Sequence, residues 1–309
     1  MNLPEPESGP APARGRPAWR RFRRDGQSVA ALAVLALVTA FALMAPVWAA
    51  WTGHPYDATF PREGLDAGGR PVGPGAEFWL GADQLGRDVL VRAAYGARVS
   101  LAVGVAAAAL ATLPGVAVGL LAGYAGGAVD TVITRLLDIT LALPALLVAI
   151  TLATTFPVTS ATAGLVMTVL VIAFFSVAGF GRVIRGQVIA LREREFVAAA
   201  RALGAGHLRI MAVELLPNLT AQITVLASLL VPTAIVAEAT LSFLGVGVRP
   251  PTPSWGSMLG EGGEVFRTAW WLLAVPAALL LLTTLSFNLV GDGVRDALDP
   301  RPDRAAGRG

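Results

Sequence analysis

The sequence contains no lysine and no cysteine, and its only histidines are His54 and His207. All 24 basic residues are therefore arginine, so the lysine-containing loop that cradles nucleotide phosphates is absent. The chain is not expected to bind ATP through such a loop. The lack of cysteine and the scarcity of histidine leave no ligand spacing typical of a zinc, iron–sulfur or haem site. We accordingly predict no metal site, no bound cofactor and no catalytic residue.

Charge is also scarce, because only 15% of the residues are charged whereas 55% are hydrophobic, with a mean hydropathy of +0.64. A soluble domain cannot hide that much apolar surface from water, so the composition predicts an integral membrane protein. The net charge is +3. Because the arginines lie beside apolar runs rather than on one basic face, we expect contact with the lipid bilayer and not with nucleic acid.

The run from Ser28 to Trp51 is uncharged and long enough to cross a hydrocarbon core of about 30 Å at about 1.5 Å per residue. A cleaved signal peptide is the alternative interpretation, but its apolar region usually has only about 7 to 15 residues, which favours a membrane anchor. The run from Ile139 to Gly181 is about twice one span, so we expect it to fold back around Pro157. Further spans are predicted at Val99–Leu121, Ala221–Leu244 and Ala269–Leu289.

These runs predict an all-α polytopic membrane protein with six transmembrane helices. The expected organisation is a disordered basic tail at 1–26, a first helix at 27–51, an extracytoplasmic segment at 52–97, a five-helix core at 98–292 with a cytoplasmic loop at 184–219, and a C-terminal tail at 293–309.

Two arginine clusters predict the orientation, because loops rich in arginine remain in the cytoplasm. Residues 51–98 are predicted to lie outside the cytoplasm although they also carry arginines, but acidic residues offset the charge of these arginines. An even number of spans then places both termini in the cytoplasm. The first cluster is Arg14, Arg16, Arg20, Arg21, Arg23 and Arg24, and the second is Arg182, Arg185, Arg192, Arg194, Arg201 and Arg209.

The second cluster surrounds the stretch EFVAAARALGAGHLRIMAVELLPNL, residues 195–219. Strong helix formers are followed by Gly204, where a C-terminal cap would lie, and a second helix is expected from His207 to Leu216, ending at Pro217. Glu195 lies in the first helical turn, where a carboxylate is favoured by the helix dipole and can accept from an arginine of a partner.

Two interpretations of this amphipathic stretch remain open. It is either a connector resting at the lipid headgroups or a docking site for a cytoplasmic partner. Alanines at 198, 199, 200 and 202 favour docking, because a face resting on the membrane would prefer bulkier apolar residues.

The same stretch resembles the EAA loop, a signature of bacterial ABC-importer permeases. The matching positions are Ala199, Ala200, Gly204, Leu216 and Pro217. The glutamate of the signature falls on Ala198, whereas Glu195 holds the acidic position that the peptide-transporter branch usually has three residues earlier. Docking here is therefore expected to depend more on Glu195, the alanine face and Gly204 than on the usual charge.

Other segments are similar to the C-type permease subunit of dipeptide, oligopeptide and nickel importers. WLGADQLGRDVLVRAAYGARVSL (79–101) resembles that branch's GTDxxGRD segment, with Ala82 in place of threonine. The likeness extends over about residues 20–301 and includes GLLAGYAGGAVDTVITRLLDITLALPALLVAI (119–150), EATLSFLGVGVRPPTPSWGSMLGEG (238–262) and FNLVGDGVRDALDPR (287–301).

This resemblance implies a type I ABC-importer permease fold in the bacterial plasma (inner) membrane. It implies a heterodimer with a homologous sister permease, two cytoplasmic ATPase subunits that bind ATP-Mg, and an extracytoplasmic solute-binding protein. The chain would then be a transporter subunit and not an enzyme. The resemblance assigns contact with the ATPase to a coupling helix and its flanks: Glu195, Ala198, Ala199, Ala200, Arg201, Gly204, Leu216 and Pro217.

Within the predicted spans, Glu238 is a candidate for the translocation path because an ionisable group facing lipid is costly, but a structural role near the membrane interface is favoured. Pro232 is expected to kink its helix, for gating or for packing. Arg135 and Asp138 lie three residues apart and are expected to pair. A passive channel and an intramembrane enzyme are the alternative functions.

Overall fold

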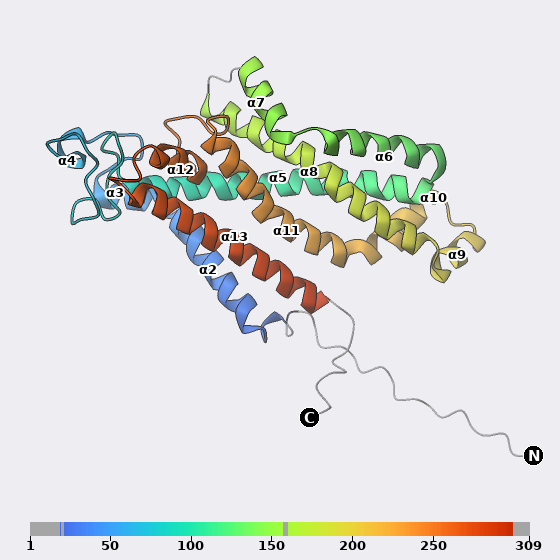
Figure 1. Cartoon of the computed structure of the whole chain (residues 1–309). Coiled ribbons are helices and arrows are strands. Elements are labelled where there is room, and N and C mark those ends of the chain that lie inside the picture. Colours follow the sequence, from blue (N-terminus) through green and yellow to red (C-terminus); the bar gives the residue numbers. More distant parts are fainter. Residues whose placement is uncertain (1–18, 20–21, 157–159, 299–309) are drawn as a thin grey trace, which may run out of the picture.

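The computed structural model describes residue 19 and residues 22–156 and 160–298, and its regular structure there is helical (Figure 1). The predicted N-terminal tail up to residue 18, the predicted turn around Pro157 and the predicted C-terminal tail from residue 299 lie outside the described residues. The all-α prediction is confirmed.

Five helical stretches in the described part are long and apolar enough to cross a membrane. They are α2 (Gly26–Leu43), α5 (Val89–Ala125), α8 (Ala161–Arg192), the continuous stretch His207–Phe243 that ends with α11 (Leu216–Phe243), and α13 (Trp271–Leu298). The remaining elements are α3 (Ala45–Thr52), α4 (Pro61–Gly64), α6 (Gly127–Ala142), α7 (Ala145–Thr155), α9 (Glu195–Ala202), α10 (His207–Arg209), the π-helical turn η1 (Ile210–Leu215) and α12 (Trp255–Gly263).

The remaining candidate span is a broken one, formed by α6 and α7, whose axes differ by 78°. Pro144 supplies no backbone N–H and disfavours a helical conformation at the residue before it, so Leu143 is extended and α6 ends at Ala142. This break was not predicted from the sequence.

The expected end of a helix at Pro217 is wrong, because the helix continues from His207 through Pro217 to Phe243. The turn before the proline is π-helical, and Pro217 occupies the first turn of α11. Pro217 has no N–H, so it donates no backbone hydrogen bond within this continuous stretch. Pro232 also lies inside α11, where it is buried.

The two ends of the bundle differ. Figure 1 shows α3, α4 and α12 at one end, which we name the α12 end, and α9 and α10 at the other, the α9 end. The first turn of α2 packs beside the last turns of α13, where the Ser28 hydroxyl donates to the Leu289 carbonyl at 3.2 Å. At the start of α2, hydrogen bonds from the Ser28 hydroxyl and from nearby backbone amides lower the pKa of Asp25.

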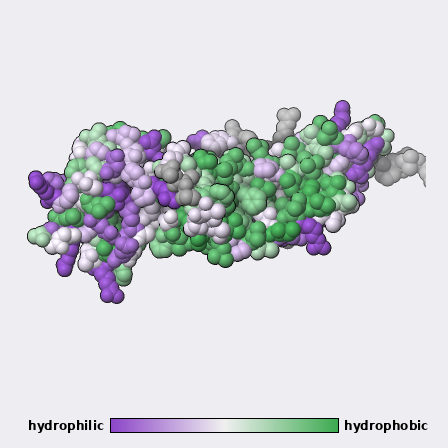
Figure 2. Space-filling view, turned by 90° about the horizontal axis from the view of Figure 1, so that it is seen from above, coloured by the Kyte–Doolittle hydropathy of each residue, from purple (hydrophilic) through white to green (hydrophobic). Residues whose placement is uncertain are grey.

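Figure 2 shows apolar residues over the middle of the molecule and polar residues at both ends, as a membrane-spanning bundle requires.

Helices α5 and α8 pack with their backbones close together. A Cβ atom added at Gly119 would lie 2.6 Å from the Gly181 carbonyl oxygen and 2.8 Å from the Ile184 Cβ. Small residues allow this approach, and dispersion contacts replace the hydrophobic driving force that is weak between helices in lipid.

We expect Gly119→Ala to destabilise the protein by about 1–3 kcal/mol, because the added methyl group has to push the two backbones apart. The measurement is thermal unfolding in detergent. Gly179→Ala is the matched control, since a Cβ at that helical glycine has no atom within 4 Å. Equal unfolding temperatures for the two variants would contradict the proposed closeness of α5 and α8.

Candidate functional site

The segment between α8 and α11, residues 193–215, is named the α9 loop. Its helix α9 is attached to the bundle by Val197, whose exposed fraction is 0%. Val197 belongs to an apolar cluster with Ile184 and Val188 of α8, Leu215 of η1 and Leu219 of α11. The loop is therefore packed onto two spanning helices.

A second attachment joins the loop to the last turn of α5. The Tyr124 hydroxyl and the His207 Nδ1 atom are 3.0 Å apart, and the Arg201 guanidinium lies 5.8 Å from the centre of the Tyr124 ring. Nearby, Arg192 Nη1 donates to the Gly123 carbonyl at 2.9 Å. The role of Tyr124 was not evident from the sequence, because no local pattern links residues so far apart in the chain.

The outward face of the α9 loop carries most of the residues singled out from the sequence. Glu195 is the first residue of α9, and it is exposed, as are Ala198 and Ala199, whereas Ala200 is half-buried. Beyond α9, Pro217 is exposed and Leu216 is half-buried. Two leucines stand out from the same loop, since Leu203 is 88% exposed and Leu208 is 78% exposed. Isolated exposed leucines are common, but two of them on a loop that also carries several arginines provide an apolar contact surface.

Gly204 has a φ of +77°, in the left-handed region that L side chains rarely adopt. It ends α9, and the Ala205 amide beyond it donates to the Ala200 carbonyl at 3.0 Å. Here a shallow cavity of about 370 Å³ opens, lined by Ala200, Leu203, Gly204, Ala205, Gly206, Arg209 and Glu214. The turn at Gly204 thus shapes the exposed end of the loop.

Two ion pairs join α6 to α8. Arg185 Nη2 lies 2.7 Å from Asp130 Oδ2, and Arg182 pairs with Asp138. The expected pair of Arg135 and Asp138 is therefore wrong. Asp138 instead reaches across to the neighbouring helix, where the Arg182 side chain is within hydrogen-bonding distance.

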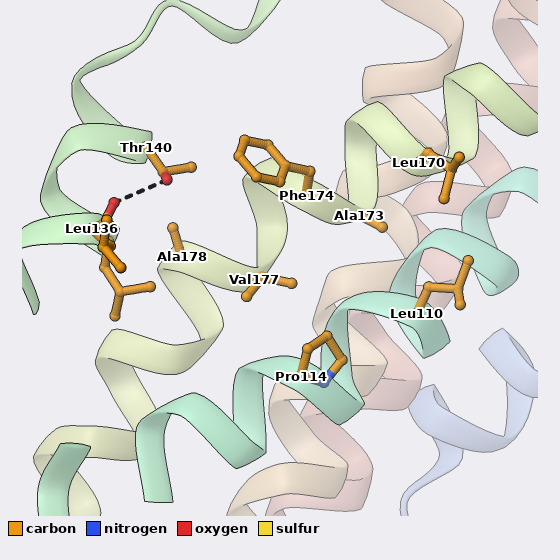
Figure 3. A pocket seen from close by; sticks show the side chains of 10 residues that line it. Leu110, Pro114, Leu136, Thr140, Leu170, Ala173, Phe174, Val177 and Ala178 are labelled. Atoms are coloured by element: carbon orange, nitrogen blue, oxygen red, sulfur yellow. Dashed lines mark hydrogen bonds between the residues drawn. The ribbon is translucent and has the colours of Figure 1, made fainter. Parts of the chain in front are cut away.

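A groove of about 600 Å³ lies between α5, α6 and α8 (Figure 3). Leu110 and Pro114 of α5 form its floor, and its one hydroxyl, on Thr140, already donates to the Leu136 carbonyl at 3.0 Å. This groove offers apolar packing surface and no catalytic chemistry.

Glu238 is fully buried within α11, and its carboxylate accepts hydrogen bonds from two serine hydroxyls. Ser100 of α5 donates at 2.8 Å and Ser242 donates at 2.6 Å. The same Ser100 oxygen accepts from the Trp255 amide at the start of α12, at 3.3 Å. Glu238 therefore joins α11 to α5 and, through Ser100, to α12. The sequence favoured a structural role for Glu238 but did not indicate these partners.

Four charged side chains form a further network at the α12 end. Arg87 and Arg92 lie between Asp83 and Glu261, with Arg92 Nη2 2.7 Å from a Glu261 oxygen and Arg87 Nε 2.6 Å from Asp83. The Arg92 side chain is 2% exposed. Since Glu261 belongs to α12 and Arg92 to α5, the network attaches α12 to the start of α5. No local sequence pattern indicates this ionic network.

The described residues contain no group of three or more histidine, aspartate or glutamate side chains placed to hold a metal ion. They bring together apolar spans, an attached loop with an exposed face and two buried polar clusters. These features are those of a multi-pass membrane transport subunit.

Comparison with known families agrees with this class. Residues 115–304 match the family of binding-protein-dependent transport system inner membrane components, and residues 14–65 match the N-terminal transmembrane domain of oligopeptide transport permease C. The chain belongs to the family of binding-protein-dependent transport system inner membrane components. Its members are permease subunits of ABC transporters and not the catalytic subunits.

Individual relatives cover nearly the whole chain. The di/tripeptide transport system permease protein of Pseudomonas aeruginosa is 40% identical over 93% of this chain and 92% of its own length. The oligopeptide transport system permease protein of Bacillus subtilis is 38% identical over 92% of this chain and 88% of its own length. A glutathione transport system permease protein of Pectobacterium atrosepticum is 38% identical over 92% and 90%, respectively.

We expect Val197→Asp to detach the α9 loop, because an unpaired carboxylate in the apolar cluster is costly to bury. Limited digestion with trypsin, which cuts after arginine, should then proceed faster at Arg194 and Arg201. Ala198→Asp is the matched control, since this neighbouring side chain is exposed. Cleavage at the same rate in both variants would show that Val197 does not hold the loop.

Proposed function

We propose that this chain is the permease subunit of an ATP-driven importer of short peptides. The observation that supports this function most directly is the likeness, over nearly the whole chain, to permeases named for di/tripeptide, oligopeptide and glutathione transport. Glutathione is itself a peptide, so these names share one chemical class. Nickel chelates, suggested by the sequence resemblance, are a second candidate cargo that these relatives favour less.

In the proposed importer the α9 end faces the cytoplasm and the α12 end faces outward. The arginines around the α9 loop and before α2 support this orientation, since such residues are retained in the cytoplasm. A sister permease would complete the translocation path, two ATPase subunits would supply ATP hydrolysis at the α9 end, and a solute-binding protein would deliver peptide at the α12 end. Both termini would lie in the cytoplasm.

The α9 loop is proposed to be the contact with an ATPase. Its exposed alanines allow close approach, and Leu203 and Leu208 provide apolar area. With a methyl group at Ala198, where related loops carry a carboxylate, the contact would depend on Glu195 and on the shape of the turn at Gly204.

Transmission of force follows from how the loop is attached. Val197 shares an apolar cluster with residues of α8 and α11, and His207 contacts Tyr124 at the end of α5, so a displaced loop would move with three spanning helices. Nucleotide shifts the equilibrium between inward and outward access only if it binds one state more tightly, because a ligand with equal affinity for both changes nothing. The attached loop would carry that difference to the membrane.

The function is tested by uptake of a radiolabelled dipeptide into cells that express the complete importer. We expect uptake to require this chain and active ATPases and to be competed by unlabelled di- and tripeptides. Uptake that persists when ATP hydrolysis is blocked would favour the passive channel. Competition by nickel chelates and not by peptides would favour the second cargo.

Gly204→Val is expected to reduce that uptake by about 5- to 150-fold, the usual range for lost coupling between sites. A β-branched residue resists the left-handed conformation at this position, so the turn has to rearrange. Gly206→Val is the control, because Gly206 has an ordinary φ of −69° and no atom within 4 Å of an added Cβ. Normal uptake by Gly204→Val, at equal membrane content, would reject the coupling role of the loop.

A further inference from the structure

The connection between α3 and α5 contains a cavity that the transport mechanism above does not use. Its volume is about 240 Å³, and it is lined by Trp51, Thr52, His54, Ala76, Glu77 and Trp79. Pockets for drug-sized ligands have volumes of about 300–1,000 Å³, so this one matches a single side chain better than a free small molecule.

The walls of the cavity are held by stacked rings. Trp51 contacts Trp79 edge to face, with ring centres 5.0 Å apart, and stacks on Trp48 at 5.9 Å. His54 stacks on Phe78 at 4.7 Å. The His54 Nδ1 atom is 3.0 Å from Asp88, whose carboxylate caps the start of α5. The cavity is therefore fixed to the bundle and not formed by a loose loop.

Two of these rings are open to the surroundings, since Trp51 is 66% exposed and Trp79 is 47% exposed. Tryptophans at the edge of a membrane commonly anchor it among the headgroups, which is the simplest account of both rings. That account does not explain why an exposed carboxylate, Glu77, lies in the same cavity. A carboxylate there repels lipid phosphates.

In the part of the chain that the structure describes, Glu77 is the one carboxylate that lines the cavity. Among the described residues no arginine or histidine pairs with it, whereas Asp83 pairs with Arg87 and Asp88 pairs with His54. The surrounding segment, residues 52–88, is acidic overall. Its acids are Asp57, Glu63, Asp66, Glu77, Asp83 and Asp88, and its arginines are Arg62, Arg70 and Arg87.

An aromatic face next to a carboxylate is the chemistry that recognises a cationic group. The ring attracts the cation through its quadrupole, and the carboxylate neutralises it. An acidic segment around the site attracts a basic partner before contact is made.

We propose that this cavity receives a lysine or arginine side chain of the solute-binding protein. The inference rests on the proposed function, which places this segment outside the cell and supplies that partner. Glu77 would bind the charged group, and Trp51 and Trp79 would hold its aliphatic stem and its cationic end.

The test measures binding of the purified solute-binding protein to the complete importer in nanodiscs. Glu77→Gln and Trp79→Ala should each weaken binding by about three- to tenfold, the range for a partly exposed cation contact, and the effect of Glu77→Gln should shrink at high salt. Glu63→Gln, which removes an exposed acid of the same segment, is the control and should weaken binding less than Glu77→Gln, because it removes the same charge outside the cavity. Thermal unfolding of each variant checks that its fold is intact.

A charge reversal adds a stricter test. Glu77→Lys should bind more weakly still, and reversing one basic residue on the solute-binding protein should restore its affinity. Wild-type affinity in Glu77→Gln would overturn the inference while leaving the proposed function in place. So would an effect that appears only in nanodiscs containing phosphatidylethanolamine, because the occupant would then be the ammonium of a lipid headgroup. A wild-type importer that neither binds the partner nor takes up dipeptide would instead contradict the proposed function, and this inference with it.

Discussion

In a hydrocarbon slab every backbone N–H and C=O group has to find its partner inside the protein, and this constraint governs the rest of the structure. It forces the chain into helices wherever it crosses and moves loops and most charges to the two ends, as Figure 2 shows. Within the spans, a helix break, a proline or a buried polar side chain needs contacts that compensate for it. The break at Pro144 falls between two separately formed helices, Pro217 follows a π-helical turn, and the buried Glu238 has two serine donors.

The same constraint explains how the two ends are connected. Since lipid does not drive helices together, α5 and α8 associate through close backbone contact at Gly119 and Gly181. These are long helices, and α5 alone extends from the ionic network around Arg92 to Tyr124 beside the α9 loop. A packed core has discrete arrangements rather than continuous flexibility, so in the proposed importer a displacement at one end would be carried to the other.

Local patterns predicted much of this architecture from the sequence. Hydropathy located the five unbroken candidate spans, because it depends only on consecutive residues, but it did not indicate the break between α6 and α7. The end of α9 at Gly204 followed from helix formers and a glycine. Contacts between distant residues were not predictable in that way. Arg135 seemed the natural partner of Asp138 on one helix, yet Arg182 lies closer in space. The contact of Tyr124 with His207 and the ionic network at α12 likewise depend on helix packing that no local pattern encodes.

The two ends are also built for different tasks. At the α9 end the loop presents exposed alanines and leucines, and it is attached through the buried Val197 and through the contact of His207 with Tyr124. At the α12 end, α12 is fixed to its neighbours, because Glu261 is bound by two arginines and the start of α12 is joined to Ser100. Because α12 is held by α5 at both of its ends, we expect the two helices to move together. In the proposed importer, α12 would therefore follow the displacement that begins at the α9 loop, so that one movement changes access on both sides of the membrane.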